Sequence, residues 1–345
     1  MKNKIHPDVR KKSLHKKPES QLTAKFIVID LLYDPLAETS VEPLEEAITE
    51  LAELPSDFKT NDDYKTTKMV LKKIEKGIFS MGSPPDETGR EPYGEGSETL
   101  HKVNLRKNYY MAIFQCTQAQ YKIVTGYNPN EQKFEKGAIP KNYVGDKLPV
   151  GNISWYTARG GTWPGGNPDP SAVMGKLQFK TKRKFDLPPE AQWEYACRAG
   201  TRKAYNNDTD CLVEKLEVYE QEINADVRDR NLDLIANYRF NTYCLDKGPQ
   251  EVGSKDHNNW GLYDMHGNIW EWCLDLYKDY DETTDTPIPD PVGASLESGS
   301  VYRVKRGGAG NSQPHRCRSA NRSHRDPSDL FTAVGWGFRV ILTAD

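Results

Sequence analysis

The residues best suited to chemistry lie in the stretch 261–273, which reads Gly-Leu-Tyr-Asp-Met-His-Gly-Asn-Ile-Trp-Glu-Trp-Cys. Trp270 and Trp272 alternate with Glu271, which is the spacing of a β-strand, so the two indoles should share one side and the carboxylate should point to the other. Gly267 and Asn268 tolerate positive φ and predict a turn. A carboxylate beside a carbonyl-rich turn can bind a hard cation such as Ca²⁺. Alternatively, Glu271 accepts hydrogen bonds from the turn amides.

The cysteines and histidines show no other metal-binding pattern. The six cysteines are scattered, without a C-x-x-C pair or zinc-type spacing, and they are Cys116, Cys197, Cys211, Cys244, Cys273 and Cys317. In a chain of this length they indicate reduced, buried thiols more than a disulfide scaffold. The seven histidines form no H-x-H or H-x-x-x-H cluster, so a histidine-bound iron or zinc centre has no support.

Composition excludes several classes of partner. The net charge is −3 with 28% charged residues, which gives no signal for binding a polyanion, and we expect no nucleic-acid partner. No apolar run approaches the roughly 18 residues of a transmembrane helix. The N-terminus is basic but has no apolar stretch behind it, so we expect no secretory signal and a cytoplasmic protein, unless a leader has been removed.

The chain divides into three predicted parts. Residues 1–20 are rich in lysine and predict a flexible basic arm. Residues 21–68 predict either an N-terminal extension packed on the main domain or a small accessory module. Within them, residues 25–33 have the composition of a strand and residues 41–54 the spacing of a helix. Residues 69–345 predict the main domain.

Local signals in the main domain predict short elements separated by loops. Two strands are expected in 69–82, with further strands in 100–112 and 337–342. A helix should begin after Thr117 as N-cap and end at Gly126, and a second should occupy 188–199. The glycine-rich segment 159–166 should be irregular, and the charged segment 206–233 should be a loop with a short helix.

Four segments in order resemble the formylglycine-generating-enzyme, or sulfatase-modifying factor, family. They are Gly77-Ile-Phe-Ser-Met-Gly-Ser, the stretch 185–201, the stretch 261–273, and Arg306-Gly-Gly followed by Gly337-Phe-Arg-Val. The resemblance runs from about residue 77 to residue 342. It implies a C-type-lectin-like α+β fold with two helices, short strands and much irregular structure. It also implies structural calcium, for which Asn237, Gly267, Asn268 and Glu271 are the candidate ligands; Asn237 could instead belong to an ordinary turn.

The segment that follows Arg306-Gly-Gly argues against the chemistry of the family. Formylglycine-generating enzymes oxidise a substrate cysteine with two cysteines in this segment that bind copper, a metal that prefers soft thiolates. Here residues 306–322 contain one cysteine, Cys317, and Ser312 stands about where the first active cysteine would be. We therefore expect no copper, and we interpret Cys317 as a core residue.

The same segment also resembles the variable proteins of diversity-generating retroelements, which end in a similar R-G-G, C-R-S-A-x-R and G-F-R-V framework. Between these framework residues lies a chemically mixed set, as in an adaptable binding surface. Its members are Ala309, Gly310, Asn311, Ser312, Gln313, His315, Asn321, Ser323, His324, Arg325, Ser328, Asp329, Phe331, Thr332, Val334 and Trp336. The alternative is an ordinary polar loop in a homologue that is not diversified.

These observations support three functions. The first is non-catalytic binding of an unknown protein or surface ligand through the C-terminal segment. The second is a formylglycine-generating or related oxidoreductase whose site the sequence does not reveal. The third is a structural or regulatory interaction module. The absent cysteine pair favours the first.

Overall fold

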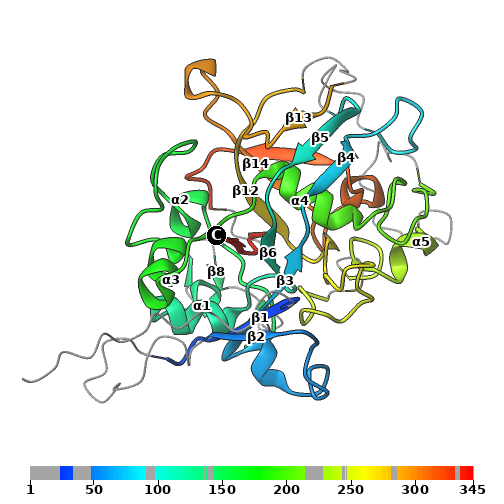
Figure 1. Ribbon diagram of the computed structural model, residues 1–345. Helices are drawn as coiled ribbons and strands as arrows, with labels where there is room; N and C mark the ends of the chain where they lie inside the picture. Colours follow the sequence, from blue (N-terminus) through cyan, green and yellow to red (C-terminus); the bar gives the residue numbers. More distant parts are fainter. Residues whose placement is uncertain are drawn as a thin grey trace, which may run out of the picture.

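The computed structural model describes residues 24–33, 48–90, 98–131, 133–134, 137–138, 143–213, 228–242, 245, 247–280, 286–330 and 335–344 (Figure 1). Several sequence-based expectations lie outside these ranges: the basic arm 1–20, residues 41–47 of the expected helix, Cys244, Phe331, Thr332 and Val334. Within the described ranges, no helix has the length and apolar character needed to cross a membrane.

The largest sheet has six strands in the order β2-β1-β3-β6-β17-β9, and every neighbouring pair is antiparallel. The strands are β1 (Phe26–Asp30), β2 (Ile48–Leu51), β3 (Lys68–Ile74), β6 (Tyr109–Ala112), β9 (Phe185–Asp186) and β17 (Ile341–Thr343). The strands expected within 25–33, 69–82 and 100–112 are confirmed by β1, β3 and β6, together with β4 (Gly77–Met81) and β5 (His101–Leu105) of a smaller sheet. The strand expected over 337–342 is divided: Trp336–Gly337 and Ile341–Thr343 are strands, and residues 338–340 between them are not. The N-terminal extension supplies β1 and β2, which join the same sheet as strands of the main domain. The boundary at residue 69 stays a prediction.

The helix expected over 41–54 is wrong where the structure describes it. Residues Ile48–Leu51 form the edge strand β2, which pairs with β1 in the register Ile48↔Ile29 and Leu51↔Phe26. Apolar residues three apart suit one face of a helix, and this spacing produced the error. Hydrogen bonding to β1, a contact between distant parts of the chain, decides the local structure instead.

Alternation along the strands divides the apolar interior into two clusters. Ile27 and Ile29 of β1 belong to one cluster, and Val28 belongs to the other. Leu71 and Val70 of β3 divide in the same way. Because successive strand residues point to opposite faces, the two clusters must lie on opposite sides of the six-stranded sheet. Strand β1 is thus covered on both faces.

A second sheet contains the C-terminal segment of interest. Its four strands follow the order β15-β14-β12-β16, and they are β12 (Trp270–Leu276), β14 (Arg303–Arg306), β15 (Arg322–Arg325) and β16 (Trp336–Gly337). Strand β12 is buried along its whole length, and it pairs antiparallel with β14 and parallel with β16. The expected strand around Glu271 is confirmed. The smaller sheets combine β4 (Gly77–Met81), β5 (His101–Leu105) and β13 (Ile288–Pro289); β7 (Lys133–Phe134) and β8 (Gly137–Ala138); and β10 (Ala236–Asn237) and β11 (His266–Gly267).

The helices agree with the sequence where capping signals are strong. Helix α1 (Gln118–Thr125) begins with a capping box formed by Thr117 and Gln120, and it ends at Gly126 with φ of 89°. Helix α4 (Glu190–Arg198) and the short α5 (Arg230–Asp233) are also as expected. The structure adds α2 (Trp155–Ala158) and α3 (Val173–Thr181), and α3 lies beside α1 in Figure 1. Short 3-10 turns occupy Asp62–Lys65, Pro129–Glu131, Leu296–Ser298 and Pro314–Cys317.

Candidate functional site

Glu271 is a buried hub of hydrogen bonds. Its Oε1 accepts from Nε2 of Gln115 at 2.9 Å and from Nη2 of Arg339 at 2.7 Å. Its Oε2 accepts from Nε1 of Trp193 at 2.7 Å and from Nε of Arg339 at 2.7 Å. The carboxylate therefore joins β12 to the loop before α1, to α4 and to the C-terminal segment. Its donors are side chains, whereas the sequence had suggested the turn amides.

The oxygens around Gln115 have the chemistry of a cation site. Its Nε2 lies 3.3 Å from the carbonyl oxygen of Asp264, 3.4 Å from that of Gly267 and 3.0 Å from that of Ile269, besides the Glu271 carboxylate. One amide nitrogen has two hydrogens for four acceptors, and the Oε1 of Gln115 is buried with no hydrogen-bond partner among the described residues. Carbonyl and carboxylate oxygens are ligands that Ca²⁺ prefers. An ion would have to displace the Gln115 amide.

The two asparagines proposed as calcium ligands have other partners. Asn268 accepts from the backbone N–H of Gln250 at 2.9 Å and donates to the carbonyl of the same residue. Nδ2 of Asn237 donates to Ser254, and its carbonyl accepts from the backbone of Asn268 at 2.7 Å. The expected turn is confirmed, because Gly267 and Asn268 have φ of 77° and 63°. The calcium site stays a prediction, and the oxygens that surround Gln115 fit the ion better than these side chains.

The thiols are placed as core residues. Cys317 is fully buried, and burial raises the pKa of its thiol above the usual value. Cys211 belongs to the same apolar cluster, and burial raises the pKa of its thiol to about 11. All five described cysteines are buried and free, as expected. Ser312 is also buried, and its Oγ accepts from the N–H of Ala309 at 3.0 Å.

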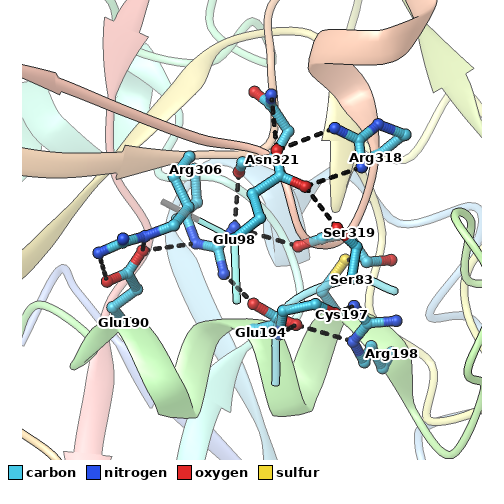
Figure 2. A network of polar contacts seen from close by, with 12 residues as sticks. Ser83, Glu98, Glu190, Glu194, Cys197, Arg198, Arg306, Arg318, Ser319 and Asn321 are labelled. Carbon is cyan, nitrogen blue, oxygen red and sulfur yellow. Dashed lines mark hydrogen bonds and ion pairs between the residues drawn. The ribbon is translucent and has the colours of Figure 1, made fainter. Parts of the chain in front are cut away.

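A buried chain of ion pairs links α4 to the four-stranded sheet (Figure 2). Arg306 contacts Glu194 through Nη2 and Glu190 at 3.1 Å through Nε. Glu194 also accepts from Arg198 at 2.8 Å, and Glu190 accepts from Nε of Arg322 at 2.7 Å. Positive and negative groups thus alternate along the chain, which is how several charges are tolerated in one interior.

A second group of ion pairs fixes the segment between β14 and β15. Arg318 donates to Glu98 at 2.9 and 3.0 Å and to Glu87 at 2.6 Å. Burial alone would raise the pKa of Glu98, but Arg318, Ser83 and Arg306 together outweigh burial and lower that pKa below its usual value. The carbonyls of Ser319 and Asn321 accept from Nη1 of Arg306. The loop-tying role expected of Arg318 and Arg322 is therefore confirmed.

The predicted ligand-binding residues divide by exposure. Five are buried: Ala309, Ser312, His315, Asn321 and Trp336. Those that are exposed or half-buried are Gly310, Asn311, Gln313, Ser323, His324, Arg325, Ser328 and Asp329. The buried members belong to the framework that carries the surface. The accessible members that lie together in one element are Ser323, His324 and Arg325 on β15, an edge strand of the sheet.

Two tyrosines that the sequence analysis missed complete this surface. The ring of His324 lies 4.1 Å from that of Tyr277 and 5.2 Å from that of Tyr302, centroid to centroid. Burial, followed by the cation of Arg325, lowers the pKa of His324 below its usual value. We call Tyr277, Tyr302, Ser323, His324 and Arg325 the β15 edge. Tyr302 precedes β14 directly, so pairing β14 with β15 could have identified it.

A cavity of about 210 Å³ lies where α4 approaches the end of β12. Glu190, Asp275, Tyr280, His101 and Arg322 are among its lining residues. Burial, together with the neighbouring Glu190, raises the pKa of Asp275 to about 7. The Asp275 carboxyl accepts from the backbone N–H of Glu190 at 2.7 Å. Among the side chains that the structure describes, no group of three His, Cys, Asp or Glu is arranged to hold a metal.

Short strands, brief helices and a C-terminal segment held by buried arginines define an α+β protein with the fold of formylglycine-generating enzymes. The chain belongs to the family described as the sulfatase-modifying factor enzyme 1-like domain, whose model matches residues 55–344. The predicted family and fold class are thereby confirmed.

Named relatives differ in the activities that their names state. The chain is 30% identical to a formylglycine-generating enzyme of Thermomonospora curvata, over 76% of this chain and 90% of that one. It is 27% identical to the serine/threonine-protein kinase pkn1 of Chlamydia pneumoniae, over 78% of this chain but only 37% of the kinase. The solved structure of Treponema denticola variable protein 1 shares the fold, with a TM-score of 0.57 and 22% identity over 80% of this chain and 96% of that one.

Proposed function

We propose that this chain binds a ligand, without catalysis, through the β15 edge. The observation that carries the proposal is His324, which lies half-buried between Tyr277 and Tyr302 while the neighbouring Arg325 is exposed. Tyrosine and arginine are enriched among the residues that dominate binding energy. The buried ion pairs support the proposal, since they hold the backbone of this strand independently of its exposed side chains. A pre-ordered strand loses little entropy on binding.

The proposal also rests on the state of the thiols. Copper binding needs accessible sulfur, whereas Cys317 is fully buried and Ser312 forms a backbone hydrogen bond. A formylglycine-type oxidoreductase remains the second candidate, because relatives carry that name and because Cys211 shares an apolar cluster with Cys317.

Site-specific photo-crosslinking tests the binding proposal. A benzophenone amino acid replaces either His324 or Lys102, an exposed residue of β5, in the full chain within its native cells. We expect a discrete adduct from position 324 that position 102 does not give. The Arg325→Ala substitution should reduce its yield. Identical products from both positions, or no adduct from either, would contradict the proposal.

A separate assay tests the oxidoreductase. The purified protein, loaded with Cu(I), receives oxygen and a Cys-x-Pro-x-Arg peptide, and mass spectrometry follows the peptide thiol. We expect the thiol to stay unchanged. Formylglycine formation that disappears in Cys317→Ser would replace the binding proposal with the enzyme. Whether the β15 edge is diversified is a question for the DNA, where a near-copy of the 3′ end beside a reverse transcriptase gene would answer it.

A further inference from the structure

Lys305 is a buried amine enclosed by tryptophans. It lies in β14 between β12 and β15, in register with Trp272 on one side and Ser323 on the other. Its Nζ is 3.9 Å from the ring centroid of Trp336, 5.4 Å from that of Trp270 and 5.7 Å from that of Trp272. The residue is 2% exposed. We call these three indoles and the amine the tryptophan cluster.

The amine has no polar partner within the described part of the chain. No hydrogen bond or ion pair joins its Nζ to an acceptor there, although the indole faces attract a cation. The charged groups that act on it are Arg325 of β15, Arg316 of the preceding 3-10 turn, and Asp329 beyond β15. Two of these three are cations and oppose a positive charge on Lys305, whereas Asp329 and the indole faces favour it.

Burial has the largest effect on the pKa of Lys305, and the cation of Arg325 has the next largest. Together they lower the pKa of Lys305 well below the usual value for lysine. A lysine in this state presents a neutral amine to a much larger extent than a surface lysine does at the same pH. The neutral amine carries a free lone pair and is a nucleophile toward carbonyl carbon.

We propose that Lys305 binds small carbonyl compounds covalently, as a reversible imine, within the tryptophan cluster. The amine lone pair attacks the carbonyl carbon, a C–N bond forms as the C=O π bond breaks, and one amine proton moves to the oxygen to give a carbinolamine. The nitrogen lone pair then expels the hydroxyl, the C–O bond breaks, and the second amine proton leaves with the hydroxyl as water, so that a neutral C=N bond remains. The step requires no oxidant or reductant, and water reverses it.

The surroundings suit this chemistry. The three indole rings place apolar surface next to the amine, which is the kind of surface that the carbon skeleton of an aldehyde or ketone contacts. Ser323 is the cross-strand neighbour of Lys305, and its hydroxyl is of the type that can pass a proton between nitrogen and oxygen. This activity goes beyond the proposed binding function and does not depend on it, because a carbonyl probe reports on Lys305 whether or not the β15 edge has a macromolecular ligand.

Competitive labelling of the intact wild-type protein tests the inference. Formaldehyde, the smallest carbonyl probe, is added with cyanoborohydride at about pH 7, and peptide mapping follows the methyl groups gained by each lysine. Lys102, exposed on β5, serves as the reference amine in the same chain. We expect Lys305 to be methylated faster than Lys102, since a lowered pKa increases the fraction of neutral amine. The advantage should disappear when the protein is unfolded before labelling.

The matched variant Lys305→Arg keeps a long basic side chain but removes the reactive amine. It should lose methylation at position 305 while Lys102 is labelled as before. Should this variant fail to fold, the wild-type map alone decides the question. Labelling of Lys305 at the same rate as Lys102 or more slowly in the folded protein, or its absence, would overturn the proposal and leave a buried amine without reactivity.

Discussion

Truncating Trp336 separates a core role from a direct binding role. The residue belongs to the mixed set predicted to bind ligand, yet it is only 8% exposed. Its ring meets that of Trp272 edge-on at 5.8 Å and covers the amine of Lys305. Removing a large buried aromatic side chain costs about 3–5 kcal/mol. We therefore expect Trp336→Ala to lower the free energy of unfolding by this amount.

His324→Ala is the informative comparison. His324 is half-buried and packs on two tyrosine rings, so its loss should cost about 1 kcal/mol, the typical energy of an aromatic pair. Phe179→Ala, at a side chain that is 54% exposed on α3, should change stability by about 0.5 kcal/mol or less. Urea unfolding followed by far-ultraviolet circular dichroism measures all three variants, because this signal does not depend on the tryptophan removed. A Trp336→Ala protein within about 0.5 kcal/mol of wild type would refute the core assignment.

Three further predictions concern metal, pH and the N-terminal strands. Ca²⁺ should raise the melting temperature relative to EDTA. Gln115→Ala should enlarge this rise, because the Gln115 amide no longer competes with the ion for the oxygens. Melting curves in Ca²⁺ and in EDTA that superimpose, for the wild type and for the variant, would exclude the site. Asp275 has a raised pKa in the folded state, so its stabilisation is complete below about pH 4 and is lost as the pH rises through about 7. Asp275→Asn should make the free energy of unfolding, measured with urea, depend less on pH over that range. Parallel plots of this free energy against pH for the variant and the wild type would contradict the prediction. A chain starting at residue 55 lacks β1 and β2 and should lose cooperative thermal unfolding, because the edge of β3 and apolar side chains on both faces of the sheet become exposed. A cooperative thermal transition like that of the full chain would show that these strands are dispensable.

Local signals in the sequence were enough for some elements and misleading for others. Thr117 and Gly126 mark the ends of α1 because capping depends on residues within one turn. Helix α3 lacks such marks: its N-cap, Ala172, makes no side-chain hydrogen bond, and Gly175 lies on its buried face. The strand β2 was missed because its structure depends on pairing with a distant segment.

The sequence predicts which segments contain the candidate sites but not which side chains meet there. Residues 300–306 alternate in the manner of a strand, and nothing in this local pattern marks Lys305 as buried, since lysine is almost never fully buried. Only the sheet order places β14 between β12 and β15 and brings Trp336 from a remote segment over the amine. In the same way, the carbonyls of Gly267 and Ile269 converge on Gln115, a residue about 150 positions away that no sequence motif connects with them.

The division between framework and surface explains how one segment can serve both stability and recognition. Arg306, Arg318 and Arg322 donate into buried carboxylates, and breaking such a pair leaves an uncompensated charge at a cost of about 3–5 kcal/mol. Ser323 and Arg325 lie between or beside these anchors, but their side chains are half-buried or exposed. The anchors hold the strand through buried side chains, so substitutions at its accessible positions should have little effect on folding. Under the proposed binding function, such substitutions would change ligand specificity while the backbone of the strand stays the same.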